Sequence, residues 1–147
     1  FPDPIDDNYQ IAVRIIEARS PEIQINTKKE PAEVNVTLPV KLQIFSDPSL
    51  ANYSLNMENQ SLLRKSLKEE MEKRAKELVK KTQKEYKADP FLWGLKARKE
   101  FKTLREYEDY NWDKKYVTAN VKVNYDVEIE SLGSQNKPHK AKNIGKR

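Results

Sequence analysis

The 147-residue chain has no cysteine, one histidine and three glycines. Without cysteine it can hold neither disulfides nor thiolate metal sites, and it lacks a cysteine nucleophile. The histidine, His139, lies in a lysine-rich stretch near the C-terminus, which excludes a Ser-His-Asp triad or a histidine metal site in the folded part. Three scattered glycines cannot form a phosphate-binding loop. The sequence therefore predicts a protein without catalytic groups, cofactor or metal.

The chain also lacks a hydrophobic run of about 18 residues, the length that a membrane-spanning helix needs. It begins at Phe1, with neither a signal sequence nor a lipid-attachment cysteine before the first predicted strand. We interpret it as an excised fragment or a processed product of a longer protein.

The net charge of +5 does not belong to the predicted folded part. Residues 134–147 contain five basic and no acidic side chains, whereas residues 1–133 contain 23 of each and are neutral. Because nucleic-acid binding depends on neutralising phosphates with basic side chains, a neutral folded part argues against nucleic acid as a partner. Three interpretations of the basic tail are open: contact with anionic lipid, solubility alone, or a remnant of protein production without a function.

Residues 59–88 carry the strongest structural signal. Side chains suited to a buried face recur every three or four residues, the spacing of one helix face, and no glycine or proline interrupts them. The predicted stripe consists of Leu63, Leu67, Met71, Ala75, Leu78, Thr82 and Tyr86. Asp89-Pro90 predicts the end of this long helix and a second helix that starts at once, with Asp89 as its N-cap. The residues expected on the apolar side of the second helix are Phe91, Leu92, Leu95 and Phe101.

Two eleven-residue stretches alternate between apolar and polar residues, which predicts long strands with one dry face each. They span residues 34–44 and 119–129, and shorter strands are predicted at 11–16 and 23–25. Pro39 lies inside the first long strand and has no N–H to donate. We therefore expect it on an unpaired edge, or at a point where the N–H would face outward.

The dry faces of the strands and the apolar stripe of the helix can cover one another in two layers. Because the strands come before and after the helices, the sequence predicts an α+β fold. Its two layers are a largely antiparallel or mixed β-sheet and, on one face, one long helix with shorter helices. We predict a linker from upstream domains at residues 1–10, an α/β domain at 11–133 and a basic flexible tail at 134–147.

Three motifs occur in a characteristic order along the chain. The first is TQKEYKADPFLWG at residues 82–94, the second is Asn111-Trp112-Asp113, and the third is ANVKVNY at residues 119–125. In this order and spacing they resemble the C-terminal domain of the Ger(x)C (GerAC-like) spore germination lipoproteins, over roughly residues 11–133. After residue 129 that family usually has basic residues, whereas this chain has Glu-Ser-Leu-Gly at 130–133.

The resemblance implies a non-enzymatic subunit of a nutrient germinant receptor. In that family the full lipoprotein is anchored by an N-terminal lipid at the outer face of the spore inner membrane, beside integral-membrane receptor subunits. The implied role is a protein-interaction scaffold whose partners are those subunits and the upstream domains of the same lipoprotein. The alternative is a domain that binds the germinant, a small molecule, in a concave apolar pocket.

The family motifs also supply the candidate site residues, which are Asp89, Pro90, Phe91, Trp93, Gly94, Trp112 and Gly133. They form either a docking corner for a partner or a structural corner, in which Asp89 caps a helix, Trp93 is in the core and Gly94 permits close helix-to-sheet approach. We favour the structural interpretation. The aromatic residues between positions 107 and 116 form either a recognition patch or the closed end of the fold, and we favour closure.

Overall fold

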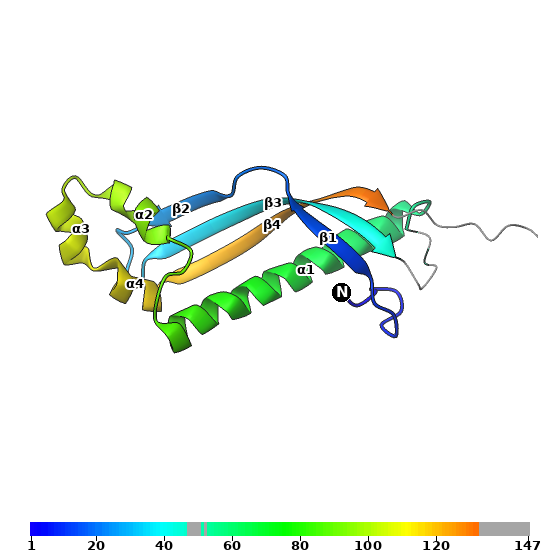
Figure 1. The fold of residues 1–147 in the computed structure, drawn as a ribbon, viewed down its shortest axis with the longest axis horizontal. Helices are drawn as coiled ribbons and strands as arrows, with labels where there is room; N and C mark the ends of the chain where they lie inside the picture. Colours follow the sequence, from blue (N-terminus) through cyan, green and yellow to red (C-terminus); the bar gives the residue numbers. More distant parts are fainter. Residues whose placement is uncertain (47–50, 52, 133–147) are drawn as a thin grey trace, which may run out of the picture.

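The computed structural model describes residues 1–46, 51 and 53–132, so Gly133 and the predicted tail lie outside the described residues. Along the chain the elements are β1 (Ala12–Glu17), β2 (Glu22–Asn26), β3 (Glu33–Ser46), α1 (Met57–Lys81), η1 (Thr82–Tyr86), α2 (Trp93–Ala97), η2 (Arg98–Glu100), α3 (Leu104–Tyr110), α4 (Trp112–Thr118) and β4 (Asn120–Leu132). The strands form one long sheet, α1 runs along it, and α2 to α4 gather at one end (Figure 1). This arrangement confirms the predicted two-layer α+β fold.

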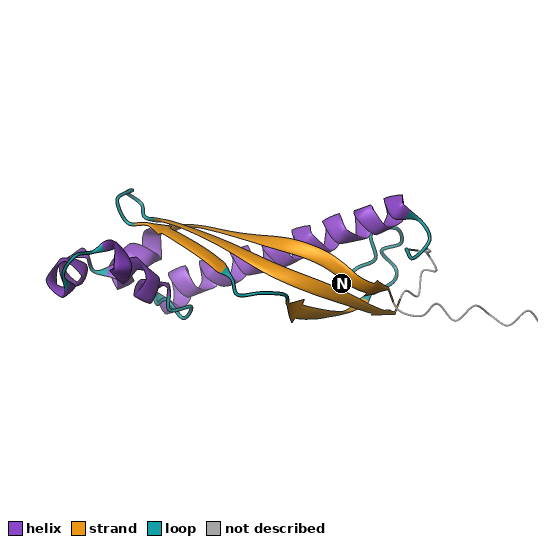
Figure 2. Ribbon diagram, turned by 90° about the horizontal axis from the view of Figure 1, so that it is seen from above, coloured by secondary structure: helices purple, strands orange, loops and turns teal. Residues whose placement is uncertain are grey.

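The strands and the long helix run along the length of the molecule (Figure 2). β3 is the central strand of the sheet. On one side it pairs antiparallel with β2 along its first half and with β1 along its second half. On the other side it pairs with β4 in parallel. The sheet is therefore mixed, and α1 to α4 lie in the long crossover that parallel neighbours require.

Of the two positions predicted for Pro39, the unpaired edge strand is wrong, because β3 is paired on both sides, and the point where an N–H would face away from a paired strand is the one observed. Pro39 lies where its neighbour is interrupted, between Glu17 at the end of β1 and Glu22 at the start of β2. Its carbonyl accepts a hydrogen bond from the Ala18 backbone N–H at 3.0 Å. Since the nitrogen and carbonyl of a strand residue point to the same side, the nitrogen of Pro39 faces this interruption and leaves the β3/β4 ladder intact.

The long helix begins and ends close to the predicted residues. Asn56 is its N-cap, and the Asn56 side chain accepts hydrogen bonds from the Glu58 and Asn59 backbone N–H groups. η1 continues α1 as a π-helical turn to Tyr86, and Lys87 then adopts a left-handed conformation with a φ of 50°. A left-handed residue commonly ends a helix, because it turns the chain away from the helix axis.

The predicted apolar stripe of the long helix is confirmed at Leu63, Leu67, Met71 and Thr82, which are buried, but between Met71 and Thr82 the buried position is Val79 and not the predicted Leu78. Leu67 and Met71 are buried, whereas Leu78 is 51% exposed and the next residue, Val79, is only 6% exposed. Tyr86, predicted on the same stripe, is 63% exposed. The reason is that α1 packs along β4 at one side of the sheet, so its face toward β1 and β2 stays partly uncovered.

The buried residues of the described chain form a core cluster toward each end of the sheet. The first core cluster contains Ala32, Val34, Val36, Val79, Trp93, Ala97, Trp112, Tyr116 and Ala119. The second core cluster contains Ile11, Val40, Leu42, Ile44, Tyr53, Leu63, Leu67 and Met71. Residues 1–10, predicted as a linker, pack on the second core cluster: Asp3 is 2% exposed and accepts a hydrogen bond from the Tyr53 hydroxyl at 2.5 Å.

Candidate functional site

Asp89 is the centre of the corner that follows α1 and η1. Its Oδ1 accepts a hydrogen bond from the Phe91 N–H at 3.1 Å. Its Oδ2 accepts hydrogen bonds from the Gly94 N–H at 2.8 Å and from the Trp112 indole N–H at 2.9 Å. Hydrogen bonds to an ionised carboxylate are stronger than neutral ones. One side chain thus ties the corner to α2 and to α4.

Gly94 permits a close approach between α2 and α4. A Cβ at this position would lie 2.7 Å from Cδ1 of Trp112 and 3.0 Å from the hydroxyl oxygen of Tyr107, so a side chain would force the indole to move. The preceding residue, Trp93, is 5% exposed and stacks on Phe91 with ring centroids 4.5 Å apart. Trp93 belongs to the first core cluster, and Phe91 packs against that cluster.

The prediction that a second helix starts at Pro90, capped by Asp89, is wrong. α2 begins at Trp93, after Leu92 adopts a left-handed conformation with a φ of 58°. Because the helix starts later, its apolar face is also turned relative to the prediction. Leu92 and Leu95 are 65% and 62% exposed, and α2 buries Trp93 instead.

Aromatic residues of α4 close the same end of the fold. Trp112 and Tyr116 are buried, with ring centroids 6.3 Å apart. The Tyr116 hydroxyl lies 2.6 Å from the Thr82 hydroxyl in the π-helical turn, and burial raises the pKa of Tyr116. Gln83 Nε2 donates hydrogen bonds to the Tyr116 and Ala119 carbonyls at 2.8 and 2.9 Å. These contacts fasten the end of the long helix to α4 and to the start of β4.

A groove of about 510 Å³ opens between α1 and the β1/β2 side of the sheet. We call it the apolar groove, because its walls include Ile15, Ile23 and Leu38 from the sheet, Leu78 from α1 and Phe91 from the corner. Ile15 and Leu78, in the walls of this groove, are 47% and 51% exposed, so the groove presents contiguous apolar side chains to solvent. This surface exists because α1 buries Val79 in place of Leu78 and leaves Leu78 in the wall of the groove.

Arg74 is the charged residue in the wall of the apolar groove, and its charge is already paired. Its Nε donates a hydrogen bond to Glu70 Oε1 at 2.8 Å, and its guanidinium carbon lies 4.8 Å from the centre of the Phe1 ring. The hydrogen bond from Arg74 holds the pKa of Glu70 below its ordinary value. The apolar groove therefore presents no unpaired charge from this residue.

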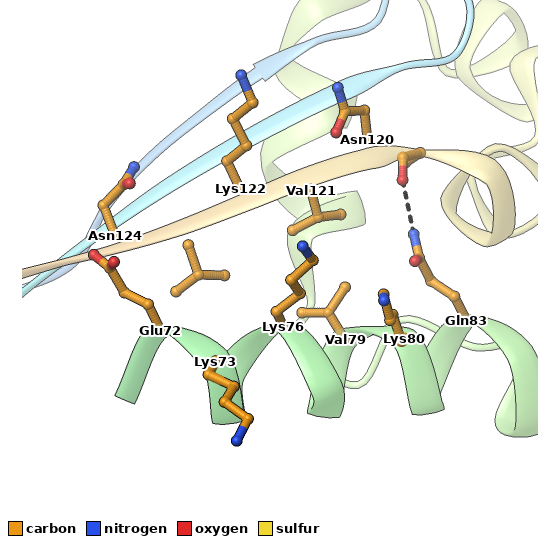
Figure 3. A pocket seen from close by; sticks show the side chains of 12 residues that line it. Glu72, Lys73, Lys76, Val79, Lys80, Gln83, Asn120, Val121, Lys122 and Asn124 are labelled. Atoms are coloured by element: carbon orange, nitrogen blue, oxygen red, sulfur yellow. Dashed lines mark hydrogen bonds between the residues drawn. The ribbon is translucent and has the colours of Figure 1, made fainter. Parts of the chain in front are cut away.

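On the other side of α1, a groove of about 660 Å³ lies between α1 and the outer edge of β4 (Figure 3). We call it the basic groove, because Lys73, Lys76, Lys80 and Lys122 line it against one acidic lining residue, Glu72. In Figure 3, Lys76 rises from α1 toward β4, and Lys122 leaves β4 on the face that points away from α1.

Glu72 connects α1 to the edge of β4. Its Oε1 accepts a hydrogen bond from the Tyr125 backbone N–H at 3.1 Å and lies 3.8 Å from Lys68 Nζ. Burial raises the pKa of Tyr125, and the neighbouring charge of Glu72 raises it further. The carboxylate of Glu72, the acidic residue of the basic groove, therefore already has partners within the protein.

Among residues 1–46, 51 and 53–132, no group of three or more His, Cys, Asp or Glu side chains is arranged to hold a metal ion. In the same described ranges, no helix combines the length and the apolar character needed to cross a membrane.

The structure brings together most of the sequence-predicted site residues. Those that meet around the Asp89 carboxylate or stack beside it are Asp89, Phe91, Trp93, Gly94 and Trp112. Pro90 is exposed between them. Sequence reasoning missed both grooves. The available signal was that Leu78, in the predicted stripe, is followed directly by the apolar Val79. Neighbouring helix residues point in different directions, and the structure buries Val79 while leaving Leu78 half exposed.

Comparison with protein-family models and solved structures identifies the family of the chain. Residues 1–133 match the family model described as "Spore germination B3/ GerAC like, C-terminal". The fold is similar to that in the "Crystal Structure of the GerBC protein", with a TM-score of 0.61 and 16% sequence identity, covering 83% of this chain and 41% of that one. The chain thus spans about two-fifths of the length of GerBC. No curated protein matches the chain significantly. The predicted resemblance is confirmed, and the chain belongs to the GerAC-like C-terminal family of spore germination proteins.

Proposed function

We propose that the chain is a domain of the C subunit of a nutrient germinant receptor, and that it acts as a protein-interaction scaffold without enzymatic activity. Family membership supports the receptor role. The proposed partners are integral-membrane subunits of the receptor and the upstream domains of the same lipoprotein. The proposed location is the outer face of the spore inner membrane, through a lipid anchor upstream of this chain.

The apolar groove is the observation that carries the scaffold role. Its exposed Ile15 and Leu78 belong to one concave surface with Ile23, Leu38 and Phe91. Contiguous exposed apolar surface is typical of a site that another protein covers. Because the charge of Arg74 is paired with Glu70, the groove suits an uncharged segment. We propose that it binds an apolar segment of an integral-membrane subunit.

We propose a structural role for the corner residues predicted from the family motifs. The carboxylate of Asp89 positions the backbone of Phe91 and the indole of Trp112. Phe91 and Trp93 in turn form one end of the apolar groove. The corner would thus support binding by shaping the groove, while its own polar groups are used within the fold.

The test uses the full lipoprotein in its receptor complex. Leu78→Asp puts a carboxylate in the wall of the apolar groove, and Leu104→Asp is the matched control, because both leucines are 51% exposed and only Leu78 lines the groove. Burying an unpaired carboxylate costs more than the roughly 1.4 kcal/mol that corresponds to a tenfold change in affinity. We expect Leu78→Asp to reduce the co-isolation of the integral-membrane subunits at least about tenfold, and Leu104→Asp to leave it unchanged.

A second candidate function uses the same groove. Its volume of about 510 Å³ lies within the range of small-molecule sites, about 300–1,000 Å³, which favours a germinant-binding domain. NMR titration of the chain with nutrient amino acids and sugars separates the two functions. Saturable shifts at Ile23 and Leu38 would support germinant binding. Absence of shifts, together with loss of co-isolation in Leu78→Asp, would support the scaffold, and unchanged co-isolation would contradict it.

A further inference from the structure

We propose that the outer edge of β4 is a strand-addition site for an extended, acidic segment of a partner protein. The site is the basic groove, on the opposite side of α1 from the apolar groove. The inference goes beyond the proposed function, because it concerns a different surface and a different chemistry. Either proposal can fail without the other.

The hydrogen bonds of β4 show which of its peptide groups face outward. The Asn120 N–H donates to the Ala32 carbonyl at 2.8 Å, on the side of β3, whereas the Tyr125 N–H donates to Glu72, on the side away from β3. Peptide groups alternate along a strand, and the β3/β4 register is regular in this stretch. The N–H and carbonyl groups of Val121 and Val123 therefore face outward, where no strand of the described chain pairs with them.

The fold caps this edge at both ends of the stretch and leaves its middle open. At one end, Gln83 of η1 binds the Ala119 carbonyl, and at the other, Glu72 of α1 binds the Tyr125 N–H. Between them, Val121 and Val123 line the basic groove of about 660 Å³, and Val121 lies beside α1 in Figure 3. An exposed row of unpaired peptide groups is a template for another strand, and a groove beside it provides the room.

The charges beside the open stretch define the partner. Lys76, Lys80 and Lys122 line the groove and make no ion pair with any described residue. Lys76 comes from the α1 side of the sheet and Lys122 from the opposite face, so acidic side chains on either face of an added strand would meet a lysine. Lysines on an edge also oppose pairing with a second basic edge, which disfavours another copy of this chain.

Hydrogen exchange of the chain, followed by NMR, tests the proposal with a synthetic peptide of alternating glutamate and threonine. Strand addition should slow exchange of the outward Val121 and Val123 amides by about tenfold or more at saturation. The inward amides of Lys122 and Asn124 already bond to β3 and should change little. The same peptide with lysine in place of glutamate should bind at least about tenfold more weakly. Binding of the acidic peptide without this alternating protection would overturn strand addition, and equal affinity for both peptides would overturn the acidic specificity.

Two matched pairs of variants sharpen the test. The double variant Lys76→Glu/Lys80→Glu should weaken peptide binding by about tenfold or more, and Lys96→Glu/Lys99→Glu, on exposed lysines outside the groove, should leave it within about twofold.

A pair of proline variants tests the backbone of β4. Val123→Pro removes one outward N–H inside the groove, whereas Val127→Pro removes one outward N–H outside the groove. Weaker binding only in Val123→Pro would support pairing with the β4 backbone. Equal effects of the two prolines would contradict it, and the exchange pattern of the unmodified chain decides the question if either variant unfolds.

Discussion

The apolar groove and the basic groove are formed by the same helix, yet they present opposite chemistries. Leu78 and Ala75 of α1 line the first, and Lys76 and Lys80 line the second. Neighbouring residues on a helix are about 100° apart, so positions only one or two apart in sequence face different sides. Val79 points between them and is buried against the sheet.

The difference shows how a sheet wider than its covering helix acquires binding surfaces. Because α1 packs along β4, the sheet face at β1 and β2 keeps apolar side chains that nothing in the described chain covers completely. On the β4 side, the uncovered groups are peptide N–H and carbonyl groups of the edge. Side chains therefore dominate recognition on one side of α1, and the backbone with flanking charge dominates on the other.

The largest predicted change in stability distinguishes a buried leucine of α1 from one that lines the apolar groove. Leu67→Ala should lower the free energy of unfolding by about 3 kcal/mol, because it leaves a cavity in the second core cluster. Leu78→Ala should lower it by less than about 1 kcal/mol, because half of that side chain is already in water. Urea unfolding followed by circular dichroism measures both. Equal losses would mean that the apolar groove is closed in solution and would remove the contrast.

A smaller effect is expected at Gly94, behind the corner that ends the apolar groove. Gly94→Ala should lower the free energy of unfolding by about 2 kcal/mol, because its Cβ would meet the Trp112 ring. Alanine normally stabilises a helix relative to glycine, so the sign of the effect is itself informative. In NMR spectra, signals of Phe91 should move while those of Val121 in the basic groove stay unchanged. A stabilised variant would contradict the close packing of α2 on α4.

The smallest predicted effect is on the pKa of Tyr125, a residue that contacts both grooves. Its side chain lines the apolar groove, and its backbone N–H donates a hydrogen bond to Glu72 of the basic groove. Its pKa is raised, first by burial and then by the charge of Glu72. Since the folded-state pKa lies above the unfolded one, the stability contributed by the neutral tyrosine is complete below about pH 10 and is lost as the pH rises through the folded pKa.

Titration of Tyr125 by ring-carbon NMR measures this shift. Glu72→Gln should lower the pKa of Tyr125 and still leave it above the ordinary value, because burial is the larger cause. A pKa that returns fully to the ordinary value in Glu72→Gln would mean that the side chain is solvated and that the apolar groove is wider than described.

Local patterns predicted much of this fold and part of the corner. The period of residues 59–88 and the alternation at 34–44 and 119–129 correspond to α1 with η1, β3 and β4. The Asp-Pro pair correctly marked the end of the long helix. It did not mark the start of the next, because the start depends on Leu92 in a left-handed conformation and on Asp89 binding Trp112, which is 23 residues away.

Periodicity alone thus established the long helix, the strands and the apolar face of the two long strands, because side-chain direction repeats within a few residues of the same segment. The central position of β3, its parallel pairing with β4 and the side of the sheet that α1 covers were decided only by the packed molecule. The physical reason is that these features join distant residues, such as Glu33 with Asn120 and Glu72 with Tyr125. The alternation within a strand shows which of its faces is apolar, but it does not show which strand lies next to it. The two grooves depend on that pairing and on the position of α1, so they form only when the layers pack.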